Sequence, residues 1–252
     1  MKRSLILTVI VGGALLSAAC SNSTAPQGSQ VALSFSGTAP AAGPVLSRAA
    51  AAPLTDALGN TLDVTRAQVV LREIDLKRTA AACPAVDTED DGCEKFEAGP
   101  VLVDLPLDGS TAQQVAVNIP PGTYSEVEFE IHKISSSDAE DAAFRTANPD
   151  FAGISIKVDG MYNGQAFTYT TDLDVEQEFD LMPPLVVDSV MATNVTVRID
   201  ISQWFQDATG NFVDPASANK GGQNESIVNE NIKQSIEAFE DRDRDGDDRD
   251  EG

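Results

Sequence analysis

Two short acidic segments have a spacing that could hold a calcium ion. The C-terminal segment has carboxylates at alternate loop positions, and Gly246 follows the third of them. Its carboxylates belong to Asp241, Asp243, Asp245 and Asp247. Alternate spacing lets one short turn aim several oxygens at one ion, and calcium needs about six to eight of them. The twelfth position, where a bidentate Glu should complete the loop, is Gly252.

A second acidic segment precedes Gly92, and its alternate carboxylates are those of Asp87, Glu89 and Asp91. Charged runs in water are commonly solvated loops or disordered tails, so both segments are open to that simpler interpretation. Calcium binding here would be weak, in about the millimolar range of extracellular modules. The sequence predicts either no cofactor or weakly bound Ca²⁺.

The remaining chemistry is sparse. His132 is the single histidine, so the chain cannot build a multi-histidine metal site. It follows Glu126, Glu128 and Glu130 in alternation, which predicts a surface strand histidine and leaves a metal ligand or base as the alternative. A carbohydrate-active enzyme would need two of these carboxylates in a cleft, whereas a flat strand gives an open surface. No nucleophile elbow, zinc-protease motif or phosphate-binding glycine loop occurs, so we expect no enzyme and no catalytic residue.

The overall charge excludes one class of partner. The 252 residues include 40 Asp plus Glu and 17 Lys plus Arg, which gives a net charge of −23. Affinity for nucleic acid comes mostly from Lys and Arg that neutralise phosphates. We therefore expect no nucleic-acid partner.

The N-terminus carries an export signal. Residues 1–19 contain a basic start, a short apolar run and small residues, which together are typical of a signal peptide. Because Cys20 follows directly, residues 16–20 resemble a bacterial lipobox, which implies cleavage before Cys20 and its acylation. Ser21 after that Cys implies transfer to the outer membrane of the cell envelope. The alternative is an ordinary cleaved signal that leaves a free thiol.

The mature chain then begins with a lipid-anchored tether. Residues 20–30 are small and polar after the cysteine, which is typical of a flexible linker. Acyl chains contribute about 0.8 kcal/mol for each buried methylene, so two or three of them would hold the protein firmly on the membrane. We expect the membrane to be a partner of this chain through that lipid.

The other two cysteines, Cys83 and Cys93, remain as a pair if Cys20 carries lipid. An oxidising envelope would join them in a disulfide, which would contribute about 2–3 kcal/mol by restricting the unfolded chain. A metal site is the alternative, but it lacks the two further ligands that a closed zinc site needs. The disulfide remains a prediction from cysteine number and compartment.

The body of the chain alternates as β-strands do. Residues 126–131 and 195–201 place apolar side chains on one face and polar ones on the other. Weaker alternation occurs at residues 31–35, 101–107, 115–119, 154–158, 167–169 and 175–181. Asn163-Gly164 between two such runs is a strong hairpin signal. About nine strands with short connections predict an all-β, antiparallel β-sandwich over residues 31–205.

One ambiguous segment and the C-terminal region complete the prediction of the secondary structure. Residues 66–78 fit both a helix and a strand, and the β-branched neighbours favour a strand. Residues 206–240 are expected to form a connection and a C-terminal amphipathic helix over 225–240, followed by a disordered acidic tail at 241–252. The apolar stripe of that helix consists of Val228, Ile232, Ile236 and Phe239. Trp204 is expected to pack in the core or at a sheet end, with a sugar-stacking platform as the alternative.

Three segments carry a family resemblance. Residues 72–76, residues 103–105 and the corner Pro120-Pro121-Gly122-Thr123-Tyr124 are similar to an uncharacterised bacterial lipoprotein domain family. The resemblance covers about residues 55–205 and implies an immunoglobulin-like or transthyretin-like β-sandwich. That family has no established activity, so it implies no catalytic residue.

These features predict a lipid-anchored envelope protein with a non-catalytic binding, adhesion or structural role. Its partner would be an envelope protein or a glycan that the sequence does not identify. The alternative is a calcium-responsive surface module that uses the loop at 87–94 and the tail at 241–251.

Overall fold

Strands make up most of the folded chain. The computed structural model describes residues 29–37, 53–79, 95–108, 110–139, 141–188 and 193–240. The strands are β1 (Ser29–Gly37), β2 (Leu54–Thr55), β3 (Thr61–Arg78), β4 (Lys95–Ala98), β5 (Val101–Asp104), β6 (Thr111–Ile119), β7 (Gly122–Ile131), β8 (Ile156–Tyr162), β9 (Gln165–Thr171), β10 (Val175–Val187), β11 (Thr193–Ile199) and β12 (Ile236–Glu240). The helices are α1 (Ala142–Ala147) and α2 (Glu225–Gln234), with 3₁₀ turns η3 (Pro149–Phe151), η4 (Ile201–Gln203) and η5 (Pro215–Ala218).

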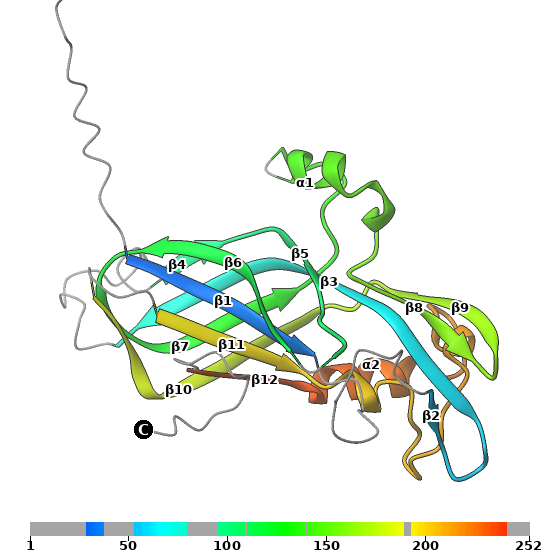
Figure 1. Ribbon diagram of the computed structural model, residues 1–252. Coiled ribbons are helices and arrows are strands. Elements are labelled where there is room, and N and C mark those ends of the chain that lie inside the picture. Colours follow the sequence, from blue (N-terminus) through cyan, green and yellow to red (C-terminus); the bar gives the residue numbers. More distant parts are fainter. Residues whose placement is uncertain are drawn as a thin grey trace, which may run out of the picture.

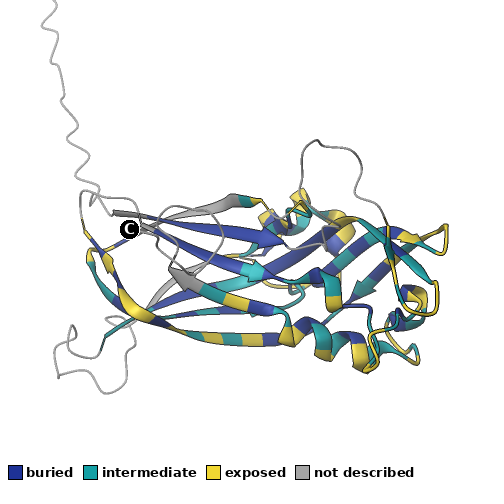
Figure 2. Cartoon of the chain, turned by 60° about the horizontal axis from the view of Figure 1, so that its bottom comes forward, coloured by how far each residue is buried: buried dark blue, intermediate teal, exposed yellow. Residues whose placement is uncertain are grey.

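The strands form two packed sheets. One sheet has the order β12-β11-β1-β6, and the other has β10-β7-β3-β8-β9 with β2, β4 and β5 also paired to β3 (Figure 1). Side chains from both sheets meet in one buried core, which includes Phe35, Phe129 and Val197. Buried positions run along the strands, while many exposed positions lie at turns and outer edges (Figure 2). The predicted all-β sandwich is confirmed.

The ambiguous segment at 66–78 is part of β3, so the strand interpretation is confirmed. This long strand pairs with β8 along residues 62–69 and with β7 along residues 71–78. The registers shift between Val64 and Arg66 and between Leu71 and Glu73, as β-bulges do. One strand thereby connects the β8–β9 hairpin to the sandwich proper.

One pairing departs from the antiparallel expectation. β1 lies between β6 and β11, antiparallel to the first and parallel to the second. Parallel neighbours cannot be joined by a tight hairpin, and here the paired strands are far apart in the sequence, beginning at Ser29 and Thr193. Local alternation reveals each of these strands but not the direction in which they pair.

The hairpin signal at Asn163-Gly164 is confirmed. These residues have φ angles of 48° and 74° and join β8 to β9. Both positive values match the tight hairpin turn that Asn-Gly favours. Asn163 also accepts a hydrogen bond from the Thr61 amide at 2.8 Å, which ties this turn to the start of β3.

The C-terminal helix is shorter than predicted. α2 contains Val228 and Ile232, which are fully buried, but it ends at Gln234. Residues 236–240 do not continue the helix and instead form β12 against β11, with Ile236 opposite Ile199. The backbone pairing with an exposed sheet edge overrides the helical spacing of the apolar residues.

Trp204 is buried in the core, as expected for a packing residue. Its indole Nε1–H donates to Ser235 Oγ at 2.7 Å, at the junction between α2 and β12. The prediction that Trp204 is a packing residue is therefore confirmed, and its ring is not accessible to a sugar.

A small second core covers the middle of β3 on its outer side. Phe144 of α1 and Phe151 of η3 pack with Val70 and Ile134 there.

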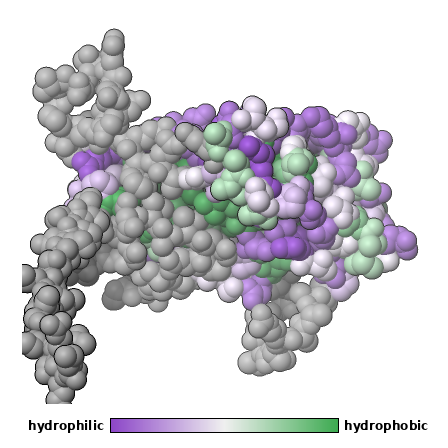
Figure 3. All heavy atoms as spheres, turned by 90° about the horizontal axis from the view of Figure 1, so that it is seen from above, coloured by the Kyte–Doolittle hydropathy of each residue, from purple (hydrophilic) through white to green (hydrophobic). Residues whose placement is uncertain are grey.

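Seen from above, the described surface is mostly hydrophilic or neutral, with hydrophobic atoms mainly near the middle (Figure 3). Among the described residues, no helix has both the length and the apolar character needed to cross a bilayer.

Candidate functional site

Three neighbouring strands bring acidic side chains together on the outer face of the larger sheet. Each β7 residue on this face stands opposite one residue of β3 and one of β10, as in the row Glu73, Glu130 and Glu176. We call the nine positions the acidic ladder. They are Glu73, Asp75 and Lys77 on β3, Glu126, Glu128 and Glu130 on β7, and Glu176, Glu178 and Asp180 on β10.

The local sequence explains why these side chains share a face. Val127 and Phe129 alternate with the glutamates of β7 and are buried in the core. Ile74 and Leu76 do the same on β3. Because successive side chains of a strand point to opposite faces, burial of these apolar residues turns the carboxylates outward.

The ladder contains one cation among its nine positions. Lys77 Nζ lies 2.6 Å from Glu126 Oε1, 2.8 Å from Glu128 Oε2 and 3.2 Å from Glu178 Oε1. The hydrogen bonds to Glu126 and Glu128 raise the pKa of Lys77 far above its ordinary value. These three carboxylates could together hold a metal ion, but the lysine ammonium already lies among them.

Elsewhere the carboxylates repel one another. Glu176 lies in hydrogen-bonding reach of Glu128, and this contact raises the pKa of Glu176 because a second negative charge there is unfavourable. Like charges that face each other across strands destabilise a sheet. The ladder is therefore an electrostatic cost that the surrounding core must offset.

A shallow hollow of about 270 Å³ lies over part of the ladder. Its walls are Arg72, Glu73, Asp75, Glu128, Phe129, Glu130 and Glu176. The Arg72 guanidinium is 3.7 Å from a Glu130 oxygen and 3.7 Å from an Asp138 oxygen. The hollow thus has a negative floor with one guanidinium at its edge.

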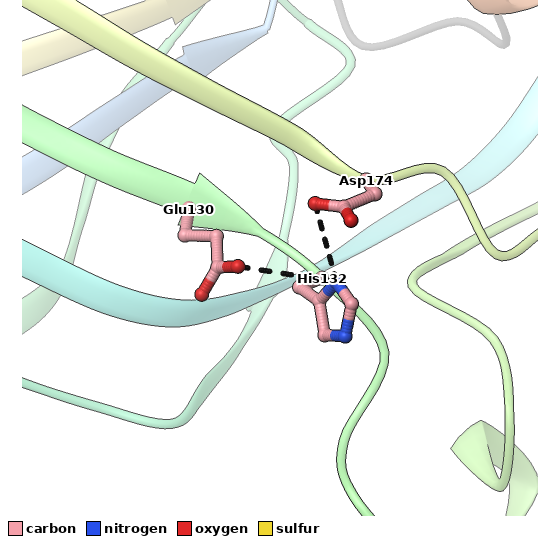
Figure 4. A group of neighbouring side chains, drawn as sticks. All are labelled: Glu130, His132 and Asp174. Atoms are coloured by element: carbon pink, nitrogen blue, oxygen red, sulfur yellow. Dashed lines mark ion pairs between the residues drawn. The ribbon is translucent and has the colours of Figure 1, made fainter.

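His132 lies just beyond the end of β7 and is half-buried, so it is not in the strand itself. Its Nδ1 is 3.2 Å from Asp174 Oδ1 and 3.9 Å from Glu130 Oε1 (Figure 4). Asp174 immediately precedes β10, and Val175 pairs with Ile131. The meeting of two strand ends therefore brings the imidazole and two carboxylates together.

A structural ion cluster lies two residues away. Asp172 Oδ2 accepts hydrogen bonds from Lys220 at 2.6 Å and from Lys133 at 3.0 Å. These two ammonium groups lower the pKa of Asp172 to about 2. The cluster connects three segments that are far apart in the sequence.

Of the residues singled out from the sequence, some lie in the part of the chain that the structure describes and others lie outside it. Glu126, Glu128 and Glu130 lie on the outer face, as predicted from alternation. The cysteines Cys20, Cys83 and Cys93, and the acidic residues Asp87, Glu89, Asp91, Asp241, Asp243, Asp245 and Asp247, lie outside the described residues. Their lipidation, disulfide and calcium predictions stay predictions.

Sequence reasoning missed the partners that complete the ladder. The missed ladder carboxylates are Glu73, Asp75, Glu176, Glu178 and Asp180, and Asp174, which lies beside His132 outside the ladder, was missed as well. A signal was present, because acidic residues alternate with apolar ones in Glu73-Ile74-Asp75-Leu76 and in Glu178-Phe179-Asp180-Leu181. Three acidic, half-buried strands in one chain indicate a shared charged face if they become neighbours.

One carboxylate pair of the ladder is too close together for glycoside cleavage. Catalytic carboxyl pairs in glycosidases stand about 5 Å or more apart, to accommodate the bond being cleaved. Glu128 and Glu176 are in hydrogen-bonding reach of each other, which is closer than that spacing.

Comparison with protein-family models, with characterised proteins and with solved structures finds no match for this chain.

Proposed function

We propose that this chain is a lipid-anchored protein of the bacterial cell envelope with a non-catalytic binding role, and that the acidic ladder is its binding face. The observation that carries the proposal is the ladder itself, with eight carboxylates and one ammonium at nine adjacent positions. The carboxylates of β10 are exposed, those of β7 are half-buried and Asp75 is buried, and a shallow hollow lies over part of this face. An open face of one charge recruits a partner of opposite charge and increases its rate of encounter.

The anchor part of the proposal rests on the sequence. Cys20 stands nine residues before Ser29, where β1 begins. An extended chain spans at most about 3.5 Å per residue, so this tether reaches about 30 Å at most. The lipid would hold the start of β1 near the membrane surface and leave the ladder in the aqueous envelope.

The ladder favours a cationic protein segment as the partner. Lys and Arg side chains of such a segment can contact several carboxylates at once, as Lys77 does within the ladder. The attraction should weaken with added salt because the β10 carboxylates of this face are exposed to solvent. A Lys- or Arg-rich segment of another envelope protein is the expected ligand.

Capture from an envelope extract tests the proposal. The bait is the full chain, compared with a ladder variant that carries Glu73→Gln, Glu176→Gln and Asp180→Asn. A matched control removes three carboxylates outside the ladder with Asp63→Asn, Asp150→Asn and Glu230→Gln. We expect the wild-type chain and the control to capture the same basic protein, and the ladder variant to lose it.

Each capture is run with calcium and again after chelation. Capture that is equal for all three baits would overturn the assignment of the ladder. Capture that disappears on chelation for all three baits would instead assign binding to the acidic segments at 87–94 and 241–251. Enzyme-like turnover of an ester, peptide or glycan library by the purified chain would contradict a non-catalytic role.

A further inference from the structure

Three potential metal ligands converge where β7 ends and β10 begins. Because Ile131 pairs with Val175, the residues just beyond that pair, His132 and Asp174, lie beside each other. Glu130 is two residues earlier on β7 and points to the same face as His132. Glu130 lies on the paired strand, and His132 and Asp174 are each one residue beyond the last backbone pair, which holds them close together.

Their separations suit one small ion. Nδ1 of His132 is 3.2 Å from Asp174 Oδ1 and 3.9 Å from Glu130 Oε1, and the three ligand atoms lie within 4.8 Å of one another. Zinc binds nitrogen and oxygen ligands at about 2.0–2.2 Å, so neighbouring ligand atoms in a tetrahedral site are about 3.3–3.6 Å apart. Small side-chain rotations would bring the present atoms to that spacing.

The imidazole nitrogen is directed at the carboxylates without bonding them. His132 Nδ1 is shielded from solvent and makes no hydrogen bond, although Asp174 Oδ1 is 3.2 Å away. A shielded polar atom that lacks a hydrogen bond is uncommon and calls for an explanation. A metal ion between the three groups would satisfy the nitrogen lone pair and both carboxylates together.

The neighbouring cluster provides a contrast within the same face. Glu126, Glu128 and Glu178 also form a triplet, but Lys77 Nζ lies 2.6–3.2 Å from their oxygens. The cation nearest to Glu130 is the Arg72 guanidinium at 3.7 Å, which is beyond hydrogen-bonding distance. Among the described side chains, the triplet that contains His132 therefore has one longer ion pair, from Arg72 to Glu130, and no lysine ammonium between its ligand atoms.

We propose that Glu130, His132 and Asp174 bind one divalent transition-metal ion of the zinc type. The ligands are Nδ1 of His132 and one oxygen of each carboxylate, and water completes the coordination. An imidazole ligand favours zinc-type ions, whereas calcium takes oxygen ligands, so this site differs from the calcium loops expected in the acidic segments. The ion would join β7 to β10, and the proposal does not depend on the lipid anchor.

Calorimetric titration with zinc chloride tests the site. The full chain is prepared without a histidine tag, and its cysteines are reduced and alkylated so that thiolates cannot bind the metal. We expect one zinc ion per chain at this site. His132→Ala and Asp174→Asn should each weaken its binding at least tenfold, the loss typical of removing even an outer-shell partner. The matched control, Asp150→Asn, removes an exposed carboxylate outside the triplet and outside the acidic ladder and should bind as the wild type does.

A spectroscopic measurement separates a ligand role from a structural one. Cobalt(II) bound by the wild type should give visible absorption bands that His132→Ala lacks, while circular dichroism shows the same fold for both. Asp174 is exposed, so Asp174→Asn serves as the second variant if His132→Ala does not fold. Zinc uptake that is absent from the wild type, equal in all variants, or displaced by equimolar calcium would overturn the proposal.

Discussion

The ammonium of Lys77 lies 2.6 Å from the carboxylate of Glu126, the residue directly opposite it on the neighbouring strand. Two further carboxylates, those of Glu128 and Glu178, share the same ammonium. This lysine therefore offsets much of the repulsion among the central residues of the acidic ladder. The stability of the sheet at this point should depend on that one positive charge.

Removal of this charge should destabilise the fold. Lys77→Met leaves three neighbouring carboxylates without their shared cation, and we expect the free energy of unfolding at pH 7 to fall by about 1–2 kcal/mol. Urea denaturation measures the change. Lys233→Met, on the exposed side of α2, is the matched control and should change stability little. Equal losses for both variants would show that the ladder does not depend on Lys77.

Neutralising one repelling carboxylate should have the opposite effect. Glu128 raises the pKa of Glu176 in the folded chain, so Glu176 favours folding below its ordinary titration range and loses that contribution as the pH rises through its raised pKa. Glu176→Gln should therefore melt at a higher temperature than the wild type at pH 7. The difference should vanish below about pH 3, where the glutamate is protonated in both the folded and the unfolded state. Thermal denaturation at the two pH values checks this, and a destabilised variant at pH 7 would contradict it.

Asp172 should show the reverse pH dependence. Lys220 and Lys133 lower its pKa to about 2, so its stabilising contribution is present above its ordinary value of 3.8 and is lost as the pH falls toward 2. Asp172→Asn should lower the free energy of unfolding at pH 7 by about 1 kcal/mol, and by much less near pH 2. Urea titrations at both pH values measure this difference. Asp150→Asn, at an exposed carboxylate 3.6 Å from Lys157, is the control that should stay near wild type.

The contact between Trp204 and Ser235 should hold the C-terminal segment on the sandwich. Ser235→Ala leaves the buried indole N–H without its acceptor, which should cost about 1–2 kcal/mol of unfolding free energy. The single tryptophan makes fluorescence a direct probe, because its emission should shift to longer wavelength on unfolding. Ser226→Ala, at an exposed position of α2, should leave the midpoint unchanged. A wild-type midpoint for Ser235→Ala would contradict the anchoring role.

Local patterns predicted much of this fold because burial imposes a period of two on each strand. The alternation at 126–131 correctly predicted β7 and the outward direction of Glu126, Glu128 and Glu130. Asn163-Gly164 correctly predicted a hairpin because both positions need positive φ. These features depend on residues that are close in the sequence.

The ladder and the last strand depend on pairing between distant segments. Glu73 and Glu176 face Glu130 only because long connections bring β3 and β10 to either side of β7, and no local pattern encodes that register. Ile236 has helical spacing from Ile232, yet it pairs with Ile199 on β11. The parallel neighbours β1 and β11 likewise follow from the assembly of the whole sheet.

The predicted attachment of Cys20 to lipid would determine where in the cell this chain works. Cells that express the wild type or Cys20→Ser are grown with an alkyne fatty acid and then fractionated. The account predicts label on the wild type, which should sediment with the membranes, and no label on Cys20→Ser, which should leave the membrane fraction. An unlabelled wild-type chain in the cytosol would contradict it.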